Sequence, residues 1–301
     1  MRSIALAAVL SLFAAAPAVA FDACVRGLER AAVERGVSPA VASRAFAEAE
    51  RDARVLELAS RRPEFTLEIW DYMAFLVDDE RVRDGRAMRD VHGDLLAEIE
   101  RHYGVDRHVV LAIWGIETDY GRRTGGHFLP HSLATLICAG DRRRDFWRSE
   151  LMAAMELVAA GDLELDALYG SWAGAFGHTQ FIPTSYRRLA VDFDGDGRRD
   201  LVGSIPDALA STANYLVRAG WRSGAPFMIE VTVPRGYAGP TGRDAKVTLE
   251  RWDARGVRRA DGSRLTGAGR AGLLLPAGPA GPGFLVFANF DAIYAYNHAE
   301  S

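Results

Sequence analysis

The stretch VVLAIWGIETDYG, residues 109–121, places seven apolar residues and a glycine before a single acid, Glu117. At about 100° per residue, a helix puts Val110, Ile113 and Glu117 on one face, so the carboxylate points where core side chains point. An apolar environment raises the pKa of a carboxyl group, and a carboxyl that stays protonated near neutral pH can act as a general acid. Glu117 is therefore a candidate catalytic acid. A buried glutamate paired with an arginine, or one at the surface of a helix end, would give the same pattern.

Asp119 is the nearest candidate for a second carboxylate. It lies about 200° around the helix from Glu117, so the two acids cannot face one substrate if the helix continues. We expect Asp119 to meet Arg122, Arg123 or solvent instead. No other acid nearby is an evident partner for Glu117 in the two-carboxylate scheme that most glycosidases use.

A second informative stretch is GSWAGAFGHTQFIPTSY at residues 170–186. Its small residues allow the backbone to approach a ligand or another segment closely. Ser171 and Gln180 offer hydrogen bonds, and rings such as Trp172 and Tyr186 offer flat apolar faces, a combination that suits sugar rings. A tightly packed junction between a helix and a loop uses the same residue types, so both interpretations stay open at this point.

The composition is that of a globular protein, with 301 residues of which 49% are hydrophobic and 25% charged. This balance excludes a disordered chain, a collagen-like repeat and a coiled coil. The formal net charge is −4, and the 36 basic residues, of which only Lys246 is a lysine, are scattered along the chain. We therefore expect no nucleic-acid partner.

Helical patterns dominate up to Trp221, and a proline- and glycine-rich part with alternating, β-rich segments follows. The patterns predict helices at 40–51, 79–103, 107–118, 150–160 and 205–219, and strands at 228–233, 246–252 and 283–287. The predicted fold class is α+β, predominantly α-helical. It comprises a helical region over 21–222, a small β-rich subdomain over 223–288 near the C-terminus, and a return segment to the core over 289–301.

Residues 1–20 have the pattern of a secretory signal peptide, with a basic residue, an apolar run and an A-x-A site ending at Ala20. The run is too short to span a bilayer, and Phe21 rather than a cysteine follows the cleavage site. We expect an exported protein with neither a lipid nor a transmembrane anchor. In such a protein Cys24 and Cys138 can form one disulfide, and two separately buried thiols are the alternative.

The segment DFDGDGRRD, residues 192–200, has aspartates at positions 1, 3, 5 and 9 and glycine at position 6, the spacing of an EF-hand calcium loop. Acids at this spacing are costly without a cation, which favours a Ca²⁺ site over a plain polar turn. Position 12 is Gly203 rather than the usual bidentate glutamate, and Asp207 is the candidate to replace it. Within a loop over 192–207, the expected ligands are Asp192, Asp194, Asp196, the carbonyl of Arg198, and Asp207.

Four segments, in order along the chain, resemble the lytic murein transglycosylase B family, which has a lysozyme-like core. They are AIWGIETDYG at 112–121, GAFGHTQFIPTSY at 174–186, DALASTANY at 207–215, and the pairs Asn289-Phe290 and Tyr296-Asn297. The resemblance implies a lysozyme-like helical core and runs from about residue 60 to the C-terminus. Chains of this family usually continue past the Tyr-Asn pair into a final helix. Because this chain stops at Ser301, we expect that helix to be missing.

The resemblance also implies a periplasmic enzyme that cleaves the β-1,4 bond between N-acetylmuramic acid and N-acetylglucosamine in peptidoglycan. Glu117 matches the family's single catalytic acid, which protonates the leaving oxygen and then, as a base, activates the muramic C6 hydroxyl. That hydroxyl attacks C1 and leaves a 1,6-anhydro end, so no second carboxylate is needed. The residues that the resemblance places along the sugar groove are Ser171, Gln180, Tyr215, Tyr296, Asn297 and, on a weaker local match, Tyr72.

Two other functions remain open. A hydrolytic lysozyme-type muramidase would use water in place of the C6 hydroxyl. A non-catalytic peptidoglycan-binding module would keep the aromatic groove, but it would not need an acid at position 117.

Overall fold

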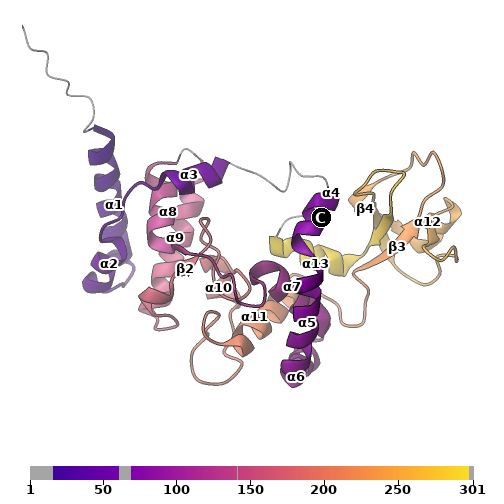
Figure 1. The fold of residues 1–301 in the computed structure, drawn as a ribbon, viewed down its shortest axis with the longest axis horizontal. Coiled ribbons are helices and arrows are strands. Elements are labelled where there is room, and N and C mark those ends of the chain that lie inside the picture. The colour runs from indigo at the N-terminus through magenta and orange to yellow at the C-terminus, as the bar shows by residue number, and fades with distance from the viewer. Residues whose placement is uncertain (1–15, 61–68, 141, 298–301) are drawn as a thin grey trace, which may run out of the picture. The chain divides into compact units, whose positions relative to one another are not determined.

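The computed structural model describes residues 16–60, 69–140 and 142–297 (Figure 1). The chain forms two compact units, each assembled from separate segments. The first unit comprises residues 1–61, 125–176 and 181–187, and the second comprises 62–124, 177–180 and 188–301. Of the predicted signal peptide, residues 1–15 lie outside the described residues, as do residues 298–301 of the predicted return segment.

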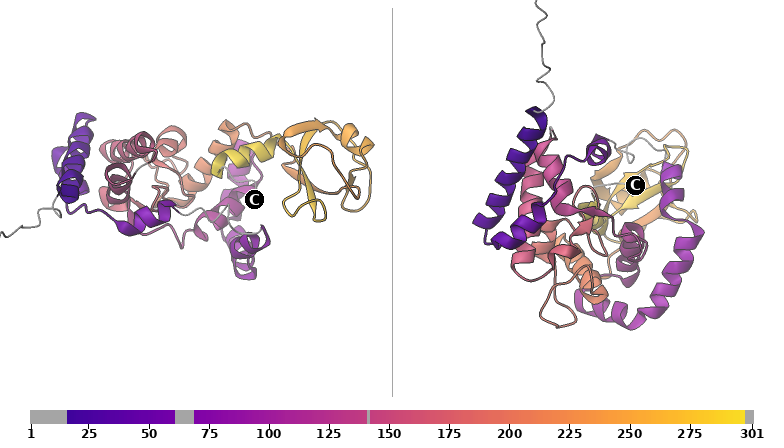
Figure 2. Two further views of the ribbon diagram at one scale, coloured as in Figure 1. Left: turned by 90° about the horizontal axis from the view of Figure 1, so that it is seen from above. Right: turned by 60° about the vertical axis from the view of Figure 1, so that its left-hand side comes forward.

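The first unit is built around helix α8 (Leu129–Cys138), which is buried along nearly all of its length. Helix α9 (Arg144–Ala159) packs beside it, as Figure 2 shows. A disulfide between Cys24 and Cys138 joins α1 to the end of α8. The remaining elements are α1 (Ala16–Glu34), α2 (Pro39–Phe46), α3 (Ala53–Ser60), α10 (Pro183–Leu189), the short 3-10 helix Leu165–Ala167, and the antiparallel pair β1 (His127–Phe128) and β2 (Tyr169–Gly170).

Most helices of the second unit share one apolar core, in which Leu96, Val110, Trp114 and Leu209 are fully or almost fully buried. They are α5 (Asp79–Val91), α6 (Gly93–Tyr103), α7 (Arg107–Thr118), α11 (Ile205–Arg218) and α13 (Ala288–Asn297). Helix α4 (Ile69–Leu76) belongs to the same unit. The prediction of one helix over 79–103 is wrong, because the chain turns at His92 (φ −106°, ψ 21°) and a new helix begins at Gly93.

The second unit also holds an antiparallel sheet whose strand order is β4-β6-β7-β3-β5. Its strands are β3 (Met228–Thr232), β4 (Gly242–Thr248), β5 (Arg258–Arg259), β6 (Arg270–Leu274) and β7 (Gly283–Val286). The prediction of a strand over 246–252 is wrong after Thr248, whose hydroxyl accepts the Arg251 N–H (3.3 Å) and caps helix α12 (Leu249–Ala254). The helix buries Trp252, whose indole N–H donates to the Ala271 carbonyl (2.8 Å).

The predicted fold class, a mainly helical α+β protein, is confirmed. In the part of the chain that is described, no helix combines the length and apolar character that crossing a membrane requires.

Candidate active site

Glu117 lies one residue before the end of α7, where the chain leaves the apolar core. It is half-buried, and this burial raises its pKa to about 7. Among the described residues no cation or hydrogen-bond donor contributes to the shift, so the alternative of a glutamate paired with an arginine does not hold there. Ile116, the residue before Glu117, is 41% exposed because the helix reaches the surface at this end.

The backbone just after Glu117 is held in an unusual conformation. Asp119 and Tyr120 both have positive φ values, 53° and 58°, before Gly121 at 85°. Such left-handed residues cost free energy and persist only where surrounding contacts fix them. The Thr118 hydroxyl provides such contacts, since it accepts the Gly121 N–H (2.9 Å) and donates to the His178 carbonyl. The end of α7 is thereby tied to residues 177–180.

Asp119 faces arginines, as the sequence predicted. Its carboxylate pairs with Arg122 (2.8 Å), Arg81 (3.6 Å) and Arg123 (3.9 Å). The hydrogen bond from Arg122 is the main reason that the pKa of Asp119 is lowered. Asp119 is therefore an ionised, fully engaged carboxylate, and it does not offer a second acid to act with Glu117.

His178 links three parts of the second unit. Its ring Nδ1 accepts the indole N–H of Trp114 (3.1 Å), and its backbone N–H donates to the Leu201 carbonyl (2.9 Å). Burial lowers the pKa of His178, so the ring is neutral, as an acceptor at Nδ1 requires. A Cβ at Gly121 would come within 2.5 Å of the His178 ring, which shows how closely the ring packs on the backbone. Sequence reasoning missed Thr118 and His178, and the only signal was their place inside the two informative stretches.

Two tyrosines from different helices, Tyr215 and Tyr296, lie against each other, and Tyr296 is also close enough to Glu117 to be affected by its charge. The Tyr296 hydroxyl donates to the Thr179 carbonyl (2.6 Å), and its ring lies 4.8 Å from the Tyr215 ring. The Tyr215 hydroxyl donates to the Ala295 carbonyl (2.6 Å). Burial first, and the nearby Glu117 charge second, raise the pKa of Tyr296. The fold therefore brings together Glu117, Tyr215 and Tyr296, which lie far apart in the sequence.

Gln180 and Asn297 are the other two predicted groove residues in the second unit. Gln180 has a φ of 54°, and its side-chain amide donates to the carbonyls of Thr124 (3.0 Å) and Gly177 (3.2 Å). These bonds fix the amide of Gln180 on the turn that also carries Thr179. Asn297 is exposed and ends α13.

Ser171 belongs to the first unit, where it closes a tight turn with Ala175 through its backbone N–H (2.7 Å) and its hydroxyl (3.0 Å). Phe176 and Tyr186 stack at 5.3 Å and are fully buried. The hypothesis that the Tyr186 ring offers a flat face to a sugar is therefore wrong, because both rings belong to the core. Tyr72 lies on α4, and its side chain is outside the described residues.

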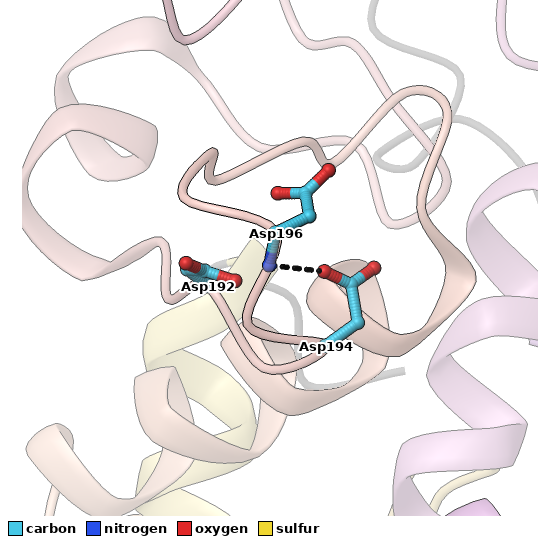
Figure 3. Close-up of side chains that lie close together, drawn as sticks. All are labelled: Asp192, Asp194 and Asp196. Carbon is cyan, nitrogen blue, oxygen red and sulfur yellow. Dashed lines mark hydrogen bonds between the residues drawn. The ribbon is translucent and has the colours of Figure 1, made fainter.

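The loop after α10 brings three carboxylates together. Ligand atoms from Asp192, Asp194 and Asp196 all lie within 4.8 Å of one another, and all three side chains are exposed (Figure 3). Backbone N–H groups shape the loop, as with Gly195 N–H donating to Asp192 (2.7 Å) and Asp196 N–H donating to Asp194 (3.3 Å). Oxygen ligands clustered in this way suit a hard cation such as Ca²⁺.

The structure does not place the Asp207 carboxylate where the sequence predicted it, among the ligands of the cation. It is completely buried, and its two carboxylate oxygens accept the N–H groups of Phe193 (2.7 Å), Asp194 (3.3 Å) and Asp200 (2.8 Å). Burial raises the pKa of Asp207 in spite of these donors. Asp207 thus holds the backbone of the loop, and it is not part of the three-aspartate group.

A family model described as the transglycosylase SLT domain matches residues 20–301. The chain belongs to this family. That finding confirms the resemblance seen in the sequence.

Individual relatives of this SLT-domain chain agree with the family. Membrane-bound lytic murein transglycosylase B of Escherichia coli is 36% identical over 155 residues, which make up 51% of this chain and 42% of that protein. The match therefore spans less than half of that relative's length.

Two solved structures are similar over most of the chain. SltB3 of Pseudomonas aeruginosa, in complex with NAG-anhNAM-pentapeptide, is 41% identical, with a TM-score of 0.88 over 93% of this chain and 76% of that one. The lytic transglycosylase Slt35 of Escherichia coli, in complex with calcium, is 28% identical, with a TM-score of 0.80 over 92% of this chain and 88% of that one. These likenesses agree with the helical fold described above.

Proposed function

We propose that the protein is a peptidoglycan lytic transglycosylase, which cleaves the bond between N-acetylmuramic acid and N-acetylglucosamine and leaves a 1,6-anhydromuramic end. The observation that carries the proposal is the state of Glu117, a half-buried carboxyl with a pKa raised to about 7. The nearest acid in sequence, Asp119, is engaged by arginines. One protonated acid without a second carboxylate suits a reaction whose nucleophile is supplied by the substrate.

In the proposed reaction Glu117 first donates its proton to the glycosidic oxygen. The C6 hydroxyl of the muramic residue attacks C1 as that bond breaks, and the Glu117 carboxylate accepts the hydroxyl proton. Bond making and breaking balance without water, and Glu117 ends protonated as it began. A pKa near neutrality serves both steps, because the same group must give and take a proton.

The other proposed roles concern binding. Tyr215, Tyr296, Gln180 and Asn297 in the second unit, with Ser171 in the first and Tyr72 on α4, would contact the glycan. The complex of SltB3 supports a glycan ligand, since that relative binds NAG-anhNAM-pentapeptide. We also propose that residues 1–20 direct the chain to the periplasm and that 21–222, 223–288 and 289–301 are its successive regions.

We propose that the loop over 192–207 holds a Ca²⁺ ion with a structural role. The carboxylates of Asp192, Asp194 and Asp196 would bind it, with the Arg198 carbonyl beside them and Asp207 organising the loop backbone. The oxygen-only group of three aspartates supports this proposal. The calcium in the Slt35 structure supports it as well.

Digestion of purified sacculi with the mature chain tests the reaction. The expected muropeptides carry anhydro ends, 18 Da lighter than hydrolysis products because one water is missing. Glu117→Gln should fold and lose almost all cleavage, about 100-fold or more, since the amide cannot donate a proton to the leaving oxygen. Asp119→Asn is the matched control and should keep most of the activity. Hydrated ends would favour a muramidase, and wild-type rates in Glu117→Gln would remove Glu117 from the mechanism.

A further inference from the structure

The first turn of α13 is anchored to the sheet of the second unit. Lys246 Nζ donates to both carboxylate oxygens of Asp291 (2.8 and 2.6 Å), and Arg243 Nη1 donates to one of them (3.0 Å). Both cations come from β4, and their side chains are only 19% and 18% exposed. Two partly buried cations on one carboxylate resist screening by salt far better than a surface ion pair does.

Two further contacts fix α13, one in its second half and one at its start. The Arg243 guanidinium lies over the Tyr294 ring, 4.1 Å from its centre. The fully buried side chain of Asn289 accepts the Arg222 N–H (2.7 Å) and donates to the carbonyls of Arg222 (2.9 Å) and Ala225 (2.8 Å). The helix therefore starts from a fixed point.

The other end of α13 reaches the candidate active site. Tyr296 follows Asp291 by five residues, about 7.5 Å along a helix axis, and donates to the Thr179 carbonyl close to Glu117. A helix this short moves as one body. A change in the position of Asp291 therefore also changes the position of Tyr296.

We propose that Lys246, assisted by Arg243, is a positioning residue, which through Asp291 sets where α13 holds Tyr296 beside Glu117. This inference rests on the proposed glycan-cleaving function. The sheet would then contribute to the reaction indirectly, because β4 holds α13, the helix that carries Tyr296, in place. Neither cation needs to touch the substrate for this role.

The anchor has a chemical consequence as well as a geometric one. Tyr296 is part of what surrounds Glu117, and burial is what raises the pKa of Glu117. If α13 loosens, water reaches the carboxyl and favours its charged form. The pKa of Glu117 then falls toward that of an ordinary glutamate, and the fraction able to act as an acid at neutral pH falls with it.

The experiment compares Lys246→Met and Asp291→Asn with two controls. Lys246→Arg keeps the cation. Asp244→Asn removes an acid next to Arg243, which pairs with Arg243 Nη1 at 3.1 Å but is 82% exposed. We expect kcat on sacculus fragments to fall about 10- to 100-fold in the first two variants with KM little changed, the size of effect that a slightly misplaced catalytic group causes. The two controls should keep rates close to wild type, at a temperature well below every variant's Tm.

A second measurement needs no substrate. The pKa of Glu117, read by carbon NMR of labelled carboxyl groups, should fall in Lys246→Met and Asp291→Asn and stay unchanged in the controls. Wild-type protein that releases no anhydro product would overturn the proposed function and leave this titration as the test of the anchor. Unchanged kcat together with an unchanged Glu117 pKa in both variants would overturn the anchor itself.

Discussion

Glu117 carries a cost in stability beside its proposed role as the catalytic acid. Its pKa is about 7 in the folded chain and returns toward the ordinary value of 4.5 on unfolding. The folded state thus favours the protonated carboxyl. The contribution of Glu117 to the free energy of unfolding is therefore greatest below pH 4.5 and declines as the pH rises toward 7. The difference corresponds to at most about 3 kcal/mol of unfolding free energy, and partial exposure reduces it.

Glu117→Gln should therefore raise Tm at pH 8 and change it little at pH 4, since the amide never has to lose a proton. Thermal unfolding at the two pH values measures this. Asp119→Asn is a control in which the effect on Tm at pH 8 should have the opposite sign. The pKa of Asp119 is lowered by Arg122, so its contribution is present at pH 8 and disappears in acid. A lower Tm for Glu117→Gln at pH 8 would contradict the claim that burying the ionised Glu117 carboxylate destabilises the fold.

The sequence predicts the position of Glu117 because the periodicity of one helix is a local property. The sequence also predicts that arginines engage Asp119, since Arg122 and Arg123 are close in the chain. It does not predict that Thr118 and Trp114 contact His178, 60 and 64 residues away. Such pairings depend on how distant segments pack, and residue type alone does not encode that.

At the scale of elements, the bond between Trp114 and His178 joins α7 to the turn at 177–180. Trp114 is almost fully buried, so His178→Phe would leave its indole N–H without an acceptor, at a cost of about 1–3 kcal/mol. His178→Asn should cost less, because its side-chain oxygen can accept in place of Nδ1. Urea unfolding measures the loss of unfolding free energy in both variants. In a protein that also carries Trp114→Phe, most of the difference between the two variants should disappear. If the difference persisted, the loss would not come from the bond between Trp114 and His178.

The loop over 192–207 supplies a second prediction at this scale. Calcium should raise Tm, because a ligand that binds only the folded state adds about 2.7 kcal/mol at 100 times its Kd. Magnesium, which prefers a tighter octahedral site, should do less. Replacing Asp192 and Asp196 together by Asn should abolish the rise. Asp261→Asn, in another exposed Asp-Gly turn, should leave it intact. An equal Tm in EDTA and in calcium, with no metal found by elemental analysis, would refute the site.

Two elements show where local patterns stop being sufficient. Residues 79–103 read as one helix, but the chain turns at His92 so that α5 and α6 both pack toward α7. Residues 246–252 alternate as a strand does, yet Thr248 caps a helix that buries Trp252. In both places tertiary packing overrides a propensity that is correct over a few residues.

At the scale of the whole molecule, the two compact units are not successive pieces of sequence. Residues 125–176 and 181–187 join the N-terminal segment, and the intervening 177–180 belong with the second unit. A reading along the chain places boundaries at changes of composition, such as the one after Trp221. The contacts that define the units are long-range, so composition gives no sign of them.

The disulfide is the one covalent cross-link of the described chain, and it closes a loop over a sequence separation of 114 residues. A link across so long a loop strongly reduces the conformational entropy of the unfolded chain. This reduction should stabilise the folded state by about 4–5 kcal/mol. Cys24→Ser with Cys138→Ser should therefore lower the free energy of unfolding by a few kcal/mol. Reduction of wild-type protein should lower it by a similar amount and add 2 Da to the mass. Because the link lies within the first unit, activity measured well below Tm should survive its loss. Two thiols open to alkylation in unreduced, exported protein would show that the bond does not form.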